Sequence, residues 1–185
     1  MRGGRRLVSA NHFNWFTLKS ALRSVYASNI PPTDTKDGIV MEKKLVTGDS
    51  CSIPAVRARG IIKNMSPGAL LSVISQTNVR HHWDERYIPG GLLERYDRRT
   101  HKSYSAQKGA GVFVSERDIV CVQTVVFPNG ELEDGFEIVQ TSVEGDEKNS
   151  GRVRAKITCA GWTVVPRGEY LELVYVMKSE FRPVL

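Results

Sequence analysis

The sequence predicts a single α+β domain built on a curved antiparallel sheet. Long runs rich in Val and Ile alternate with turn residues, and helical patterns are confined to the first half of the chain. No repeat, linker or low-complexity segment divides the 185 residues, of which 41% are hydrophobic, enough for one core. We therefore expect one domain over residues 1–185, with the sheet and a helical pair within 38–180.

An apolar stripe predicts an N-terminal helix over about residues 11–29. Trp15, Leu18 and Leu22 recur at helical spacing, which places them on one face. Pro31-Pro32 then ends the helix, because proline cannot continue the hydrogen-bond pattern.

A second helical region is predicted after residue 65. Ser66-Pro67 is a good helix start, since the serine hydroxyl can cap the helix and proline suits its first position. A shorter helical segment over 78–87 contains Trp83 and completes a helical pair. Pro89-Gly90-Gly91 breaks the helical pattern.

The remaining segments read as strands with clear turns between them. Arg98-Arg99-Thr100 is a tight hairpin connection, and Pro128-Asn129-Gly130 is a turn signature. The predicted strands are residues 38–46, 56–63, 92–97, 102–108, 117–127, 136–144, 152–165 and 170–179.

The charge is unevenly distributed. The net charge is +6, with 18 Lys and Arg against 8 Asp and Glu in residues 1–108, and 8 against 12 in residues 109–185. A basic half can contact nucleic acid or an anionic membrane surface, or it can be an ordinary solvated face. No apolar run is long enough for a membrane-spanning helix, and no apolar region follows the basic N-terminus as in a signal peptide.

Motifs of catalysis and metal binding are missing from the sequence. Cys51, Cys121 and Cys159 are too widely spaced for a zinc site, and we expect Cys121 and Cys159, which lie in apolar runs, to be reduced thiols that behave as small hydrophobic side chains. The adjacent His81 and His82 would point about 100° apart on a helix, which makes them poor ligands of one metal. We expect no catalytic residue, no metal and no cofactor.

The strand over 117–127 indicates a ligand cavity. Both of its faces are mostly apolar, and Gln123 lies in one of them between Cys121 and Val125. A few polar groups in an apolar lining are typical of a ligand pocket. In the alternative interpretation, Gln123 pairs with a backbone group in a dry core.

Four fragments, in order, resemble a known family. They are Trp83-Asp84, Glu116-Arg117-Asp118-Ile119-Val120, Gly151-Arg152-Val153-Arg154-Ala155, and Ala160-Gly161-Trp162 followed by Pro166 where a strand normally ends. Together they resemble the START (steroidogenic acute regulatory protein-related lipid-transfer) domain, over most of the chain from Gly38 onward.

The resemblance implies a helix-grip fold. In that fold a curved antiparallel sheet of about nine strands wraps a long C-terminal helix and encloses an apolar tunnel for one lipid. Sterol-binding members carry a buried carboxylate–arginine pair, but Gln123 and Tyr104 occupy these positions here in a gap-free alignment. The resemblance and the strand pattern together predict that Gln123, Tyr104, Cys121, Val125, Arg154 and Trp162 contact the ligand.

The end of the chain departs from the family. The sequence stops shortly after its last predicted strand, where the family continues into the C-terminal helix. We therefore expect a truncated form without this helix, or another segment that closes the tunnel. An uncovered apolar trough would favour self-association.

The predicted function is non-catalytic lipid binding and transfer, cytoplasmic and peripheral to membranes. The ligand is one lipid or sterol-like molecule, and Arg98, Arg99 and Lys102 at the hairpin tip are predicted to contact membranes. Two alternatives stay open: a helix-grip enzyme of the cyclase or hydratase type, and, less favoured, a nucleic-acid-binding domain. We expect no nucleic-acid partner.

Overall fold

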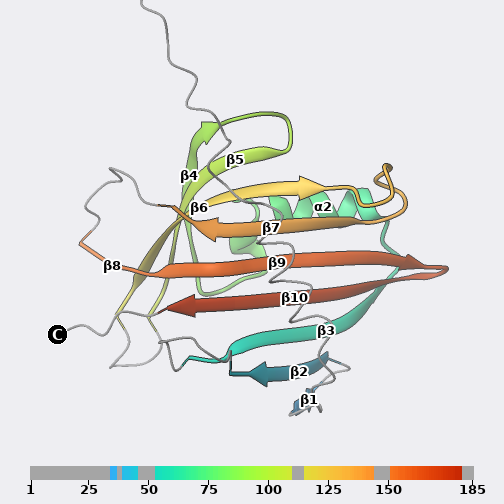
Figure 1. Ribbon diagram of the computed structural model, residues 1–185, viewed down its shortest axis with the longest axis horizontal. Coiled ribbons are helices and arrows are strands. Elements are labelled where there is room, and N and C mark those ends of the chain that lie inside the picture. The colour runs from blue at the N-terminus through green and yellow to red at the C-terminus, as the bar shows by residue number, and fades with distance from the viewer. Residues whose placement is uncertain (1–33, 37–38, 46–52, 110–114, 144–150, 181–185) are drawn as a thin grey trace, which may run out of the picture.

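The computed structural model describes residues 34–36, 39–45, 53–109, 115–143 and 151–180. The predicted helix over 11–29 and Cys51 lie outside these residues. The described chain forms a ten-stranded sheet (Figure 1), with the strand order β1-β2-β3-β10-β9-β7-β6-β5-β4 and β8 beside β6. The strands are β1 Asp34–Lys36, β2 Ile39–Lys44, β3 Ala55–Lys63, β4 Tyr87–Arg95, β5 Thr100–Gln107, β6 Arg117–Val126, β7 Phe136–Ser142, β8 Val153–Arg154, β9 Lys156–Arg167 and β10 Tyr170–Glu180.

The predicted antiparallel sheet is confirmed. Every pairing along the strand order is antiparallel, and the parallel contact of β8 with β6 is the exception in the described sheet. The predicted strand over 152–165 is divided in two because the Ala155 N–H bonds to the Asp118 carbonyl at 2.9 Å before the chain turns to pair with β7.

One α-helix, α2 (Pro67–Ser75), and one short 3-10 helix, η2 (Arg80–His82), lie between β3 and β4. α2 begins where the sequence predicts, because the Ser66 hydroxyl accepts a hydrogen bond from the Ala69 N–H at 3.2 Å. In Figure 1, α2 lies behind β6 and β7. Leu70 is buried there with Phe136, Ile138 and Val164, so the helix covers one face of the sheet over an apolar cluster.

The helical prediction for 78–87 is wrong at its end. Helical turns stop at η2, and Tyr87 is already the first residue of β4, paired with Gln107 and buried. Sheet pairing and burial of the Tyr87 ring outweigh the local helical pattern. Arg80 closes the preceding turn through an ion pair with Asp84 at 2.8 Å.

Pro89-Gly90-Gly91 does not end an element but lies inside β4. The register of β4 with β5 shifts between Ile88 and Gly91, and β4 is the edge strand, where proline does not interrupt a ladder on both sides. The two glycines differ in their surroundings. A Cβ atom at Gly90 would lie 1.8 Å from the Tyr104 carbonyl oxygen, whereas one at Gly91 would meet nothing within 4 Å.

β9 also continues past its predicted end at residue 165, through Pro166 to Arg167. The pairing of β9 with β7 stops at Val164, so Pro166 has only β10 as a neighbour in the sheet. A missing N–H is tolerated at such a position.

Register divides the side chains of the sheet between two faces. His101, Gln123 and Gln140 are direct partners across β5, β6 and β7 and share the face that α2 covers. Their sequence neighbours Val122 and Val139 are buried on the opposite face, as is Val176 of β10. We refer to these as the cavity face and the opposite face.

Candidate functional site

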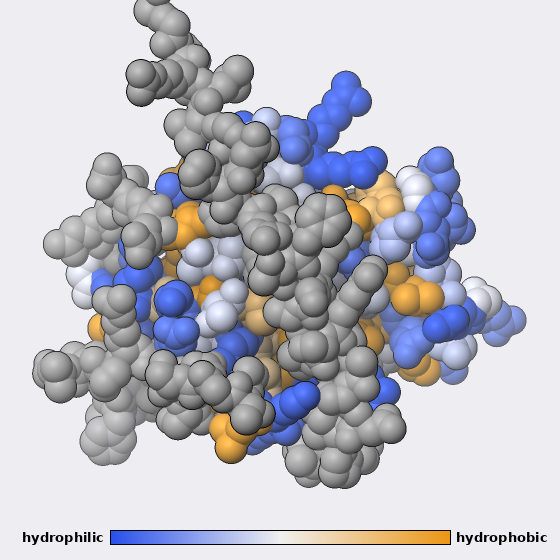
Figure 2. Space-filling view, viewed as in Figure 1, coloured by the Kyte–Doolittle hydropathy of each residue, from blue (hydrophilic) through white to orange (hydrophobic). Residues whose placement is uncertain are grey.

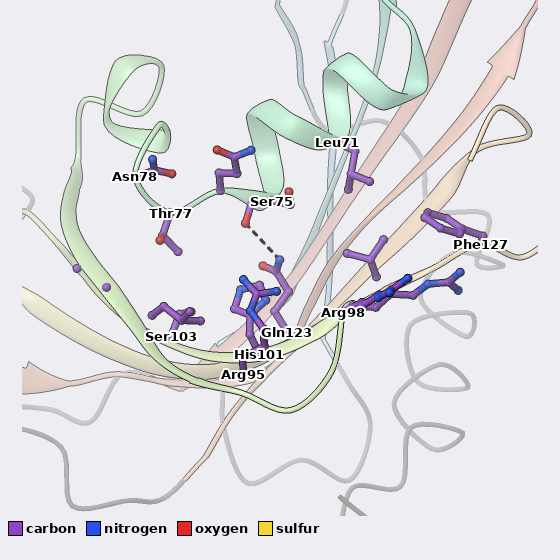
Figure 3. A pocket seen from close by; sticks show the side chains of 16 residues that line it. Leu71, Ser75, Thr77, Asn78, Arg95, Arg98, His101, Ser103, Gln123 and Phe127 are labelled. Atoms are coloured by element: carbon purple, nitrogen blue, oxygen red, sulfur yellow. Dashed lines mark hydrogen bonds between the residues drawn. The ribbon is translucent and has the colours of Figure 1, made fainter. Parts of the chain in front are cut away.

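A cavity of about 600 Å³ lies between the end of α2 and the cavity face of the sheet. In Figure 3, Ser75 points down from α2 toward Gln123, while Arg95 and His101 lie beside Gln123 on the sheet. The described residues that line it are Leu71, Ser75, Gln76, Thr77, Asn78, Gly90, Gly91, Leu92, Arg95, Arg98, Arg99, His101, Ser103, Gln123, Val125 and Phe127. The wall is therefore part apolar, part polar and part basic.

Gln123 of β6 connects the sheet to the end of α2, on the two sides of the cavity. Its amide Nε2 donates to the Ser75 carbonyl at 3.4 Å, and its Oε1 accepts a hydrogen bond from the Gln140 side chain. Ser75 is the last residue of α2, so Gln123 satisfies a carbonyl that the helix itself cannot. With 3% of its surface exposed and its amide bonded to a backbone carbonyl, Gln123 makes the backbone pairing of the alternative interpretation, at the wall of the cavity.

A second cavity of about 70 Å³ continues from the first on the same face. Both are lined by Ser103 and Gln123, and the smaller one extends toward Tyr87, Cys121 and Met177. Burial raises the pKa of the Cys121 thiol to about 11, and burial also raises the pKa of the Tyr87 hydroxyl. Both groups are therefore uncharged at neutral pH.

Three of the six sequence-predicted contact residues line these cavities. Gln123 lines both, Val125 lines the larger one and Cys121 the smaller one. They share the cavity face because they alternate along β6. Cys121 and Cys159 are free and buried, as the sequence predicts.

The structure places the other three elsewhere. Tyr104 pairs with Val120 on the opposite face, while its neighbour Ser103 lines the cavity. Arg154 forms an ion pair with Asp118, with 2.7 Å between Nε and Oδ1. Trp162 is on the cavity face but packs in the apolar cluster under α2, where its ring lies 4.3 Å from that of Tyr175.

Sequence reasoning did not assign the basic and hydroxyl groups to the cavity wall, although it placed Arg98 and Arg99 at a basic hairpin tip. His101 and Ser103 alternate along β5, as Ser105 and Gln107 do farther along, and this period-two polar pattern was the available signal. Arg95 and Arg98 are close to them because the β4–β5 hairpin brings the end of one strand beside the start of the next.

The pKa of His101 is lowered, first by its burial and then by the positive charge of Arg95. An imidazole in this position is mostly neutral at neutral pH. The second cause shows that the Arg95 charge lies close enough to act on the His101 imidazole at this end of the cavity.

On the opposite face the buried carboxylate of Glu42 is paired with arginine. Glu42 has no exposed surface, and Arg57 contacts its two carboxylate oxygens at 2.5 and 2.8 Å. Arg59 lies 3.5 Å from the same carboxylate. The hydrogen bond from Arg57 is the main cause that holds the pKa of Glu42 below its usual range.

Within the described residues, no helix is both long and apolar enough to cross a membrane. Those residues also contain no group of three or more His, Cys, Asp or Glu side chains arranged to hold a metal ion. His81 and His82 are exposed on η2, with their rings 4.0 Å apart.

No family model matches the sequence, and no curated protein matches it either. Solved structures do match in fold. Human StAR-related lipid transfer protein 5 superposes with a TM-score of 0.80 at 15% identity, over 92% of this chain and 82% of that one. The fold of the present chain is therefore START-like. The resemblance predicted from the sequence is thus confirmed at the level of fold.

Two further matches agree with the START-like fold. The lipid transfer and protein localization domain of human StarD13 has a TM-score of 0.70 at 18% identity, over 94% of this chain and 85% of that one. A STAR-related lipid transfer protein from Xanthomonas axonopodis has a TM-score of 0.68 at 20% identity, over 84% and 86%. The START-like sheet and α2 are the elements that enclose the cavity described above.

Proposed function

We propose that the chain binds one lipid in the cavity beneath α2 and exchanges it with membranes. The observation that carries the proposal is the cavity itself, whose volume of about 600 Å³ falls in the range of ligand pockets. The START-like fold supports it, because the structures it resembles are described as lipid transfer proteins.

Gln123, Cys121 and Val125 are the proposed ligand contacts among the residues predicted from the sequence, since they line the cavities. Trp162 is proposed to support the apolar part of the wall through its packing on Tyr175. Arg98 and Arg99, which line the cavity, and Lys102 on the same hairpin are proposed to meet membranes transiently.

The space-filling view agrees with a polar hairpin surface. Hydrophilic side chains project from the upper part of the molecule in Figure 2, where Figure 1 places the β4–β5 hairpin. A peripheral, cytoplasmic location and self-association through uncovered apolar surface belong to the same proposal.

An enzyme is the second candidate class, and we propose against it. Acid–base chemistry of the cyclase or hydratase type needs titratable groups placed at the substrate. His101 is such a group, but the described residues that line the two cavities include no carboxylate.

Nucleic-acid binding through the basic hairpin is the third class of function. It would show as a steep loss of affinity for oligonucleotides as the salt concentration rises.

Native mass spectrometry of freshly purified protein tests the lipid proposal. A bound lipid is expected as a mass added to the folded protein and lost on denaturation. Transfer of a fluorescent lipid between two populations of vesicles is the companion measurement. Absence of both the added mass and any transfer above the rate without protein would contradict the proposal.

A further inference from the structure

Four basic side chains from one hairpin line one end of the cavity. Arg95 ends β4, Arg98 and Arg99 form the connection, and His101 is the second residue of β5. In Figure 3, Arg95 and His101 lie against Gln123 on the sheet, and Arg98 lies near Phe127. We refer to these four as the basic cluster.

The described wall of this cavity contains no acidic residue, although the hairpin itself carries two. The Asp97 carboxylate accepts hydrogen bonds from the N–H groups of Arg99 and Thr100 at 2.6 and 2.7 Å. These backbone contacts, with that of Arg99 the largest, lower the pKa of Asp97 and stabilise the turn. Burial raises the pKa of the Tyr96 hydroxyl, and the nearby Glu94 carboxylate raises it further.

The three arginines of the basic cluster differ in their contacts within the described part of the chain: Arg99 contacts an aromatic ring, whereas the guanidinium groups of Arg95 and Arg98 have no polar partner there. The guanidinium of Arg99 lies 4.3 Å from the centre of the Phe127 ring, a cation–π contact. The guanidinium groups of Arg95 and Arg98 belong to exposed residues and make no ion pair or hydrogen bond with a described residue. Guanidinium groups in this condition suit a phosphate or a carboxylate, which they bind through paired hydrogen bonds.

The rest of the cavity suits the other end of an amphipathic molecule. Leu71, Val125 and Phe127 supply apolar wall beside the basic cluster. Toward the smaller cavity the lining continues with Ile74, Ile119 and Met177. A charged group at the hairpin and an acyl chain along α2 would each meet a matching surface.

On the basis of the function proposed above, we propose that the cavity selects lipids with an anionic headgroup, a phosphate or a carboxylate, which the basic cluster binds. Arg95 and Arg98 provide most of the selectivity, because Arg99 is already engaged with Phe127.

The test compares two soluble short-chain lipids with the same acyl chains, a phosphatidic acid and a phosphatidylcholine, by isothermal titration calorimetry. The wild-type protein should bind the phosphatidic acid about tenfold or more tightly than the phosphatidylcholine, since charge-assisted hydrogen bonds are strong. The double variant Arg95→Gln/Arg98→Gln should lose that preference, because its affinity for the phosphatidic acid should fall by a larger factor than its affinity for the phosphatidylcholine, whose phosphate carries one charge beside a choline cation. Thermal melting verifies that the variant is folded.

Lys102→Gln is the matched control. Lys102 is on the same strand as His101 but pairs with Val122, so it faces away from the cavity. The membrane contact proposed for Lys102 plays no part in a titration with soluble lipids, so this variant removes one positive charge from the same hairpin and should keep the full preference. Loss of the preference in Lys102→Gln to the same extent would overturn the proposal in favour of a diffuse charge effect.

Other outcomes separate the alternatives. Equal affinity of the wild type for both lipids overturns the headgroup proposal alone, whereas binding of neither lipid overturns the proposed function as well. Inorganic phosphate bound as tightly as the phosphatidic acid would make this a phosphate site instead. Vesicles with and without phosphatidylserine form the last arm: if the double variant loses vesicle binding but keeps its soluble-lipid preference, the arginines serve the membrane surface and the proposal is wrong.

Discussion

On the opposite face of the sheet, the buried carboxylates Glu42 and Asp118 each contact an arginine at 2.5 and 2.7 Å. On the cavity face, three arginines and a histidine line one cavity whose described wall has no carboxylate. Buried charges are costly unless they are paired, so the first arrangement is what stability favours. The second is tolerated because Arg95, Arg98 and Arg99 are exposed to water, and the ligand proposed above would bring the negative charge to them.

The largest effect should come from breaking a pair on the opposite face. We expect Glu42→Gln to lower the free energy of unfolding by about 2 kcal/mol, because it leaves Arg57 without its counter-charge. Urea denaturation measures the change. Glu172→Gln, which removes the exposed partner of Arg167 at 3.1 Å, is the control and should change stability by less than about 0.5 kcal/mol. Equal effects of the two substitutions would contradict the expectation that the buried Glu42–Arg57 pair contributes more to stability than the exposed Glu172–Arg167 pair.

The cavity face should respond in the opposite way. The double variant Arg95→Gln/Arg98→Gln removes two cations that have no acidic partner among the described residues, so the ligand-free protein should keep its stability within about 0.5 kcal/mol. A thermal melt of delipidated protein is the measurement. A strong destabilisation would show that Arg95 and Arg98 stabilise the fold. The two faces would then not differ in the contribution of their charged groups to stability.

The smallest effect is a dependence of stability on pH. The pKa of His101 in the folded protein lies below the ordinary 6.5, and the charged groups beside it are Arg95, Arg98 and Arg99. The unfolded chain therefore takes up the proton first as the pH falls, so the stabilisation is complete above pH 6.5 and is lost as the pH falls toward the folded pKa. The drop in melting temperature between about pH 7.5 and about pH 5.5 should be smaller in His101→Gln than in the wild type. An identical drop would assign the dependence to other groups.

Much of the sheet could be predicted because its signals are local. The strand over 117–127 is a Val- and Ile-rich run that ends at a proline turn, and β6 ends within one residue of it. The start of α2 was predictable for the same reason, since the Ser66 cap and Pro67 act on adjacent backbone. The path of β4 through Pro89 was not, because it depends on β4 being at the edge of the sheet.

The site was harder to predict because the register of the strands decides on which face of the sheet a side chain lies. A gap-free alignment selects Tyr104, but the residue that faces the cavity is its neighbour Ser103. A shift of one residue moves a side chain to the other face of a strand. Gln123 could be placed at the cavity wall because an amide in an apolar run is conspicuous in the sequence itself. The basic cluster was visible as a basic hairpin, but nothing local says that the hairpin curls over a cavity.

The contrast between Gly90 and Gly91 has a practical consequence for measuring occupancy. Position 91 lines the cavity and has open space for a side chain, so a cysteine introduced there could carry an environment-sensitive dye without displacing β5. Native Cys121 and Cys159 are buried thiols whose pKa values burial raises, so they react slowly with alkylating reagents. With Cys51 replaced by serine, Gly91→Cys would give a single optical reporter at the cavity wall. The emission of that dye would follow loading and release of a ligand in real time.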